Sequence, residues 1–167
     1  DPSANAARAL GLSLYSEKQY SKAMDYFKEA SNLKVDPKKS ANDQMRIASA
    51  YLKLGSPGSA KNAALKAASL RKGWGDPYLL IAQIYASVEQ SCGSNVFEKK
   101  AVYWAAINKL EYAKSIDPDV TGKANRLIAN YKQQVPNKSV SFQLGHSDGE
   151  TYSIGCIVNE TITVKFY

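Results

Sequence analysis

The chain has 167 residues, of which 44% are hydrophobic and 22% charged, and its formal net charge at pH 7 is +7. This balance is ordinary for a folded protein, and the length favours one domain with a small appendage. No apolar run approaches the roughly 20 residues that a membrane-spanning helix needs, so the sequence predicts no transmembrane segment.

Three triplets with the same internal spacing recur along the first two thirds of the chain. Within each triplet, residues at i, i+4 and i+7 would share one face of a helix, and the flanking positions are alanines that let two helices approach closely. The triplets are Ala23, Phe27, Ala30; Ala60, Ala64, Ala67; and Ala106, Leu110, Ala113. Each predicts the second helix of a repeating pair.

A second pattern precedes each triplet and predicts the first helix of the pair. It places a large residue before a small one and another large residue one turn later. Its copies are Leu10-Gly11 with Leu14, Ile47-Ala48 with Tyr51, and Ile81-Ala82 with Tyr85. Asp-Pro dipeptides at 36–37, 76–77 and 117–118 suit helix entries, because aspartate caps free N–H groups and proline tolerates the first turn.

The period changes in the last part of the chain. Apolar residues between Val120 and Tyr131 keep a helical spacing up to Pro136, which predicts a capping helix over the last repeat. Beyond it, alternation over 140–144, 152–156 and 162–166 predicts three short strands in a β-meander. We therefore expect a helical repeat domain with its capping helix over 1–136, and a meander over 137–167 packed on the repeats.

These patterns together resemble the tetratricopeptide repeat (TPR) family. The resemblance implies an all-α fold, a right-handed α-α superhelix of three TPR-like helix pairs plus a capping helix, here with a small C-terminal β-meander. It also implies a non-catalytic protein–protein interaction scaffold. The segment 98–106, the Asp-Pro at 117–118 and the tail 155–161 resemble exported bacterial TPR proteins. That second resemblance implies a periplasmic or cell-envelope location, the alternative being the cytoplasm.

Residues that could carry chemistry are sparse. The sequence contains no Gly-rich phosphate loop, nucleophile elbow or HExxH motif, and its single histidine, His146, lies in a turn. We therefore expect no catalytic residue, no cofactor and no metal site. Residues 38–72 hold eight basic side chains against Asp43 alone, yet Tyr51 is the only aromatic residue among them. This pattern favours a solvated basic face, with no nucleic-acid partner.

The TPR resemblance implies that the first helix of each pair lines a concave groove for a partner protein or peptide. Lys39, Arg46 and Lys53 are spaced seven apart and share one helix face with this groove. With Arg8 they predict an acidic partner, although Leu12 departs from the carboxylate clamp of chaperone-binding TPR proteins. The groove positions are Asn5, Arg8, Leu12, Tyr15, Asn42, Met45, Arg46, Ser49, Lys53, Leu79 and Gln83.

Two alternatives stay open at this point. The chain could instead be a structural subunit that forms homo-oligomers, or joins an envelope complex, through its β-tail. Cys92 lies in an insertion within the third repeat, and Cys156 lies on the apolar face of a predicted strand. These two residues form either a disulfide that ties the tail to the repeats or two unpaired thiols, with Cys156 a small buried hydrophobe.

Overall fold

Residues 2–33 and 36–167 are described by a computed structural model of the chain. They fall into two compact units, unit 1 ending at Leu80 and unit 2 starting at Ile81. The boundary lies inside helix α5 (Asp76–Ser87). Among the described residues, no helix is both long enough and apolar enough to cross a membrane.

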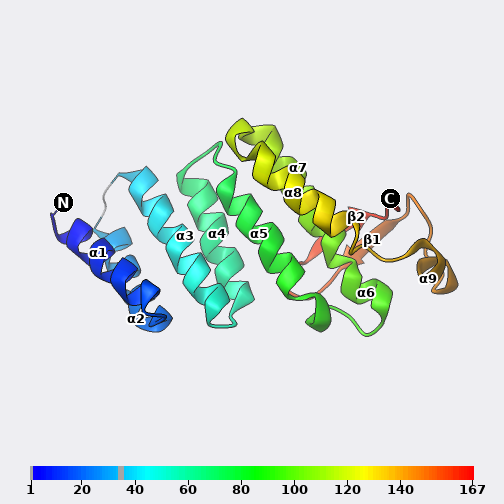
Figure 1. Cartoon of the computed structure of the whole chain (residues 1–167), viewed down its shortest axis with the longest axis horizontal. Coiled ribbons are helices and arrows are strands. Elements are labelled where there is room, and N and C mark those ends of the chain that lie inside the picture. Colours follow the sequence, from blue (N-terminus) through cyan, green and yellow to red (C-terminus); the bar gives the residue numbers. More distant parts are fainter. Residues whose placement is uncertain (1, 34–35) are drawn as a thin grey trace. The chain divides into compact units, whose positions relative to one another are not determined.

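Unit 1 consists of two helical hairpins followed by the start of α5. α1 (Pro2–Ser16) packs on α2 (Tyr20–Asn32), and α3 (Pro37–Lys53) packs on α4 (Pro57–Leu70), with α2 also against α3 (Figure 1). The predicted entry of α3 is present, since the Asp36 side chain accepts a hydrogen bond of 2.8 Å from the Lys38 N–H. Each hairpin therefore corresponds to one predicted repeat.

Small residues allow the helices of unit 1 to approach closely. The described triplet residues of the first two repeats have no exposed surface: Ala23, Phe27, Ala30, Ala60, Ala64 and Ala67. At Gly11 a Cβ atom would come within 2.6 Å of the Phe27 ring, so α1 and α2 could not keep this spacing with a larger residue there. The predicted register of the repeats is thus the register of the core.

Unit 2 is built around one buried helix. α7 (Val102–Ile116) buries Ala106, Leu110 and Ala113 completely, and α8 (Thr121–Lys132) packs against it in the predicted place of the capping helix. The insertion before α7 forms two short helices, η1 (Glu89–Ser91) and α6 (Val96–Lys100). A further short turn, η2 (Pro118–Val120), follows the aspartate cap at 117.

The C-terminal tail differs from the predicted three-stranded meander. It contains two antiparallel strands, β1 (Thr151–Ile154) and β2 (Glu160–Thr163), with Thr151 paired to Thr163 and Ile154 to Glu160. The strand predicted over 140–144 is wrong, because this segment is a helix, α9 (Lys138–Gln143).

Capping explains the helical conformation of α9. The Asn137 side chain accepts a hydrogen bond of 2.8 Å from the Ser139 N–H, and the Ser141 hydroxyl donates to the Asn137 carbonyl at 2.8 Å. Six residues of alternating polarity fit a short helix as well as a strand, so the local cap decides between them.

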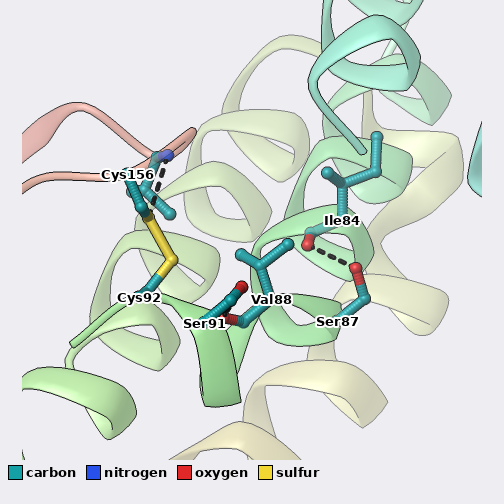
Figure 2. Close-up of a disulfide and its surroundings, with 7 residues drawn as sticks. Ile84, Ser87, Val88, Ser91, Cys92 and Cys156 are labelled. Atoms are coloured by element: carbon teal, nitrogen blue, oxygen red, sulfur yellow. Dashed lines mark hydrogen bonds between the residues drawn. A yellow bond between two sulfur atoms is a disulfide. The ribbon is translucent and has the colours of Figure 1, made fainter. Parts of the chain in front are cut away.

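A disulfide joins the insertion of the third repeat to the tail. Cys92, just after η1, is bonded to Cys156, and their Cα atoms are 5.4 Å apart (Figure 2). Cys156 does not lie within a strand as predicted, because β1 ends at Ile154 and Cys156 occupies the following turn with a φ of 51°. Figure 2 also shows the Ser87 hydroxyl donating to the carbonyl of Ile84. The Ser91 hydroxyl donates in the same way to the carbonyl of Val88, at 3.0 Å.

Side chains supply further links between the tail and the helices of unit 2. The Tyr85 hydroxyl donates to the Glu160 carboxylate, which also contacts Lys109 Nζ at 2.8 Å. Trp104 Nε1 donates to the carbonyl of Lys165 at 2.8 Å. The tail is therefore held by α5, α7 and the disulfide together.

Candidate interaction site on unit 1

A hollow between α1 and α3 is the candidate site of unit 1. Its volume is about 230 Å³. Its wall comes from α1 and α3 and includes five of the predicted groove residues: Leu12, Tyr15, Met45, Arg46 and Ser49. Phe27 of α2 also lines it, a residue that the sequence places only in the core. The lining is largely apolar, with a single cation.

Exposed apolar groups make this hollow accessible to a partner. Leu12 is 47% exposed, and Tyr15 and Met45 are half-buried. The Tyr15 and Tyr20 rings are 5.0 Å apart and meet edge to face. Burial, and then the neighbouring Tyr20, raise the pKa of Tyr15. Its hydroxyl can donate a hydrogen bond to a partner.

A cluster of three charged side chains, Arg8, Asp43 and Arg46, adjoins the hollow. The Asp43 carboxylate is fully buried and accepts from Arg8 Nε at 3.0 and 2.9 Å, with Arg8 Nη2 at 2.8 Å. Arg46 Nη1 donates to the same carboxylate at 3.0 Å. The Arg8 side chain is 11% exposed and that of Arg46 is 34% exposed. The charge of Arg8 is thus compensated within the protein, and Arg46 carries the accessible charge.

Asp43 is the residue of this cluster that the sequence does not identify. It lies 35 positions from Arg8, and a single sequence carries no signal for a contact at that separation. The available hint was local, because Asp43 is the only acidic residue in the basic segment 38–72 and stands one turn before Arg46. The predicted stripe of free cations is therefore partly an internal ion cluster.

The remaining predicted groove residues lie elsewhere. Asn5 accepts a hydrogen bond of 3.2 Å from Arg8 Nη1, which places it at the ion cluster. Asn42 and Lys53 are exposed on α3 and do not line the hollow. Leu79 is 7% exposed and belongs to the core of unit 1, whereas Gln83 belongs to unit 2.

The side chains that could ligate a metal ion are scattered over the described part of the chain. Among residues 2–33 and 36–167, no group of three or more histidine, cysteine, aspartate or glutamate side chains is arranged to hold a metal ion. His146 is stacked on the Phe97 ring at 3.6 Å and its Nδ1 lies 2.5 Å from Glu150 Oε1. This histidine therefore has a packing role in unit 2.

Comparison with known proteins finds similar solved structures but no similar sequence. No protein-family model matches the sequence, and no curated protein sequence matches it. The solved TPR2B domain of yeast Sti1, in a pHsp70 complex, matches with a TM-score of 0.64 at 19% identity over 80% of this chain and 99% of that one. The Arabidopsis OM64 TPR domain matches with a TM-score of 0.60 at 19% identity, covering 79% and 96% of the two chains.

A third solved structure extends this comparison. The first TPR of Spaghetti (RPAP3), bound to the HSP90 peptide SRMEEVD, matches with a TM-score of 0.57 at 17% identity over 79% of this chain and 94% of that one. All three are TPR domains, and their identity to this chain is too low to carry function. The likeness confirms the predicted fold: the chain has a TPR-like helical fold with a small two-stranded sheet at its C-terminus.

Proposed function

We propose that the chain is a non-catalytic interaction module that binds a segment of a partner protein in the hollow between α1 and α3. The observation that carries this proposal is the hollow itself, which joins the exposed Leu12 and the half-buried Met45 to one accessible cation, Arg46. TPR domains of similar fold include one solved with an HSP90 peptide, which supports a peptide as ligand.

The chemistry of the hollow indicates what the segment contains. An apolar side chain would remove Leu12, Tyr15 and Met45 from water, which stabilises a complex by about 25 cal/mol per Å² buried. A carboxylate next to that side chain would pair with Arg46, whose planar guanidinium has donors left after its bond to Asp43. The partner is therefore an acidic segment with an apolar anchor.

A peptide-capture experiment tests this proposal. A displayed peptide library is selected on the whole chain, and the selected peptide is measured by fluorescence anisotropy against Met45→Glu and Arg46→Gln. We expect each variant to weaken binding by on the order of tenfold. Met45→Glu puts a carboxylate into the apolar contact, and Arg46→Gln removes a charged hydrogen bond. Lys22→Gln, an exposed lysine on α2, is the matched control and should bind like the wild type.

Salt dependence separates the two contributions. Binding that relies on Arg46 should weaken between ~50 and ~500 mM salt, where exposed charges are screened. If a selected peptide binds Met45→Glu as tightly as the wild type, the binding site is not this hollow.

Self-association through the tail is a second candidate, and one observation favours it. On α9, Phe142 is 71% exposed and Leu144, just after it, is 43% exposed. A large aromatic group in this position can pack against a second copy or an envelope complex. Sedimentation at increasing concentration should then show an oligomer that Phe142→Ser dissociates, and a monomer at every concentration would contradict this candidate.

We further propose a periplasmic or cell-envelope location. The support is the disulfide between Cys92 and Cys156, since structural disulfides persist in oxidising compartments and are rare in the cytosol. Fractionation of the native cells, with non-reducing and reducing gels of each fraction, tests it. Reduced protein confined to the cytosol would contradict the proposal.

A further inference from the structure

A second and larger hollow lies within unit 2, away from the groove residues. Its volume is about 730 Å³, within the range of pockets that enclose ligands. Its wall is formed by α6, by the end of α8 and the turn after it, by the start of α9, and by the last residues of the chain, Phe166 and Tyr167. Three segments that are separate in the sequence, around 96–100, 132–140 and 166–167, thus meet around one space.

The C-terminal wall of this hollow is fixed in place. Phe166 N–H donates to Asp148 Oδ1 at 3.0 Å, and the Phe166 ring meets Trp104 edge to face at 6.2 Å. The neighbouring Lys165 carbonyl accepts from Trp104 Nε1 at 2.8 Å. Hydrogen bonds and a ring contact therefore hold the segment after β2 at this wall of the hollow.

The charge of the lining is one-sided. Lys100 of α6, Lys132 of α8 and Lys138 of α9 all line the hollow, and no aspartate or glutamate does. In the part of the chain that the structure describes, no carboxylate forms a salt bridge with any of the three. Lys132 Nζ lies 4.4 Å from the centre of the Tyr167 ring, a cation–π contact that holds the ammonium at the wall. Three cations from three elements thus line one space, and no aspartate or glutamate side chain lines it.

We propose that this hollow of unit 2 binds a second acidic peptide segment, one that carries two or more carboxylates beside an apolar side chain. Because the three lysines stand on different elements, a peptide with several carboxylates can pair with more than one of them. Val135 and Phe166 supply apolar surface for the intervening side chain. A flat lipid surface could not follow lysines that line a hollow. This site is separate from the hollow of unit 1 and does not depend on the function proposed for it.

Fluorescence anisotropy with a defined probe tests the proposal. The probe is a fluorescein-labelled peptide of sequence Asp-Glu-Phe-Asp-Glu, compared with Asn-Gln-Phe-Asn-Gln, on the whole chain at ~50 mM salt. The variant carries Lys100→Gln, Lys132→Gln and Lys138→Gln together. Its matched control loses the same charge from exposed lysines of unit 1, through Lys22→Gln, Lys38→Gln and Lys72→Gln.

We expect the first triple variant to weaken binding of the acidic probe by on the order of tenfold or more, since each exposed ion pair contributes a modest amount. The control should change it less than about twofold, and the neutral probe should bind neither protein. Val96→Trp, at a wall position that is 46% exposed, should also block the probe without entering the core. Circular dichroism of every variant should match the wild type.

Four results would overturn the proposal. An equal loss with the control triple would mean that net charge alone attracts the probe. Equal binding of the neutral probe would mean that the lysines do not recognise carboxylates. Competition by inorganic phosphate as strong as that by the unlabelled acidic peptide would assign the hollow to a simple anion. Loss with Arg46→Gln but not with the first triple would place the probe in unit 1 and leave the function proposed there intact.

Discussion

The two units of the chain hold their elements together in different ways. In unit 1, neighbouring helices approach closely at alanines and at Gly11, and the described ion cluster links α1 to the next repeat. In unit 2, bonds join segments distant in sequence: the disulfide, the Tyr85–Glu160–Lys109 contacts and the Trp104–Lys165 bond. Repeats can rely on contacts between neighbours, whereas a two-stranded hairpin is too small to be stable alone. The short β-tail therefore depends on a disulfide and on side-chain bonds to segments far away in sequence, whereas each repeat is held mainly by its neighbour.

The largest expected effect comes from removing the disulfide. The double variant Cys92→Ser, Cys156→Ser opens the loop closed by the disulfide, whose ends are 64 positions apart in the sequence. Chain entropy predicts that the free energy of unfolding falls by about 4 kcal/mol. Hydrogen exchange followed by mass spectrometry should show lost protection in β1, β2 and α9, with α1–α4 unchanged. Equal loss of protection in both units would contradict the contrast drawn between them.

The next largest effect is expected from a variant in unit 1, at the buried Asp43. Asp43→Ala leaves the partly buried charge of Arg8 without a compensating carboxylate, with only the Asn5 hydrogen bond remaining. We expect a loss of about 3 kcal/mol, the low end for breaking a buried pair. Urea unfolding measures it, with Asp25→Ala on the exposed side of α2 as the control, expected within ~0.5 kcal/mol of wild type. Adding Arg8→Leu to Asp43→Ala should recover part of the loss. If it does not, the ion cluster is not the cause.

Overpacking tests whether the repeat packing extends into unit 2. Ala60→Leu in unit 1 and Ala106→Leu in unit 2 each enlarge a side chain with no exposed surface, at a cost of about 1–3 kcal/mol. Thermal unfolding measures both, with Ala6→Leu on the exposed side of α1 as the control. A wild-type melting temperature for Ala106→Leu alone would restrict the alanine packing to unit 1.

Alkaline pH should produce the smallest effect, and mainly in unit 2. Burial, and then a hydrogen bond to Glu89, raise the pKa of Tyr103 from 10.0 to about 12. As the pH rises, the unfolded chain therefore releases this proton at a lower pH than the folded chain does. The contribution of Tyr103 to the free energy of unfolding is complete below pH ~10 and is lost as the pH rises toward 12. Burial also raises the pKa of Tyr85 and Tyr131, both in unit 2.

The unfolding free energy measured from pH 9 to 12 checks this. Tyr103→Phe should reduce the slope of the decline, and Tyr26→Phe in unit 1 serves as the comparison. An unchanged slope for Tyr103→Phe would mean that this hydroxyl does not couple to folding.

The parts of the fold that sequence predicted are those with a repeated local pattern. The triplets around Ala23, Ala60 and Ala106 mark buried helix faces because a helical stripe is a short-range signal. The strand prediction over 140–144 is wrong because alternation over five residues does not distinguish a strand from a capped helix, and the cap at Asn137 decides.

The candidate site was predictable only in part, for a related reason. Leu12, Met45 and Arg46 come from helix positions that the TPR resemblance supplies. The pairing of Arg8 with Asp43, and the meeting of Lys100, Lys132 and Lys138 around one hollow, depend on long-range packing. A single sequence contains no local signal for contacts of that kind.

The disulfide also determines how the chain would respond to a pulling force. If the two ends of the chain are drawn apart, tension passes from residue 92 to residue 156 through the sulfur atoms, and the 64 residues of separation are not stretched. At about 3.5 Å per extended residue, roughly 220 Å of contour length stays hidden until the bond is reduced. An oxidised molecule would therefore behave as a short tether whose helices α6 to α9 bear no load, and a reductant would lengthen it in one step.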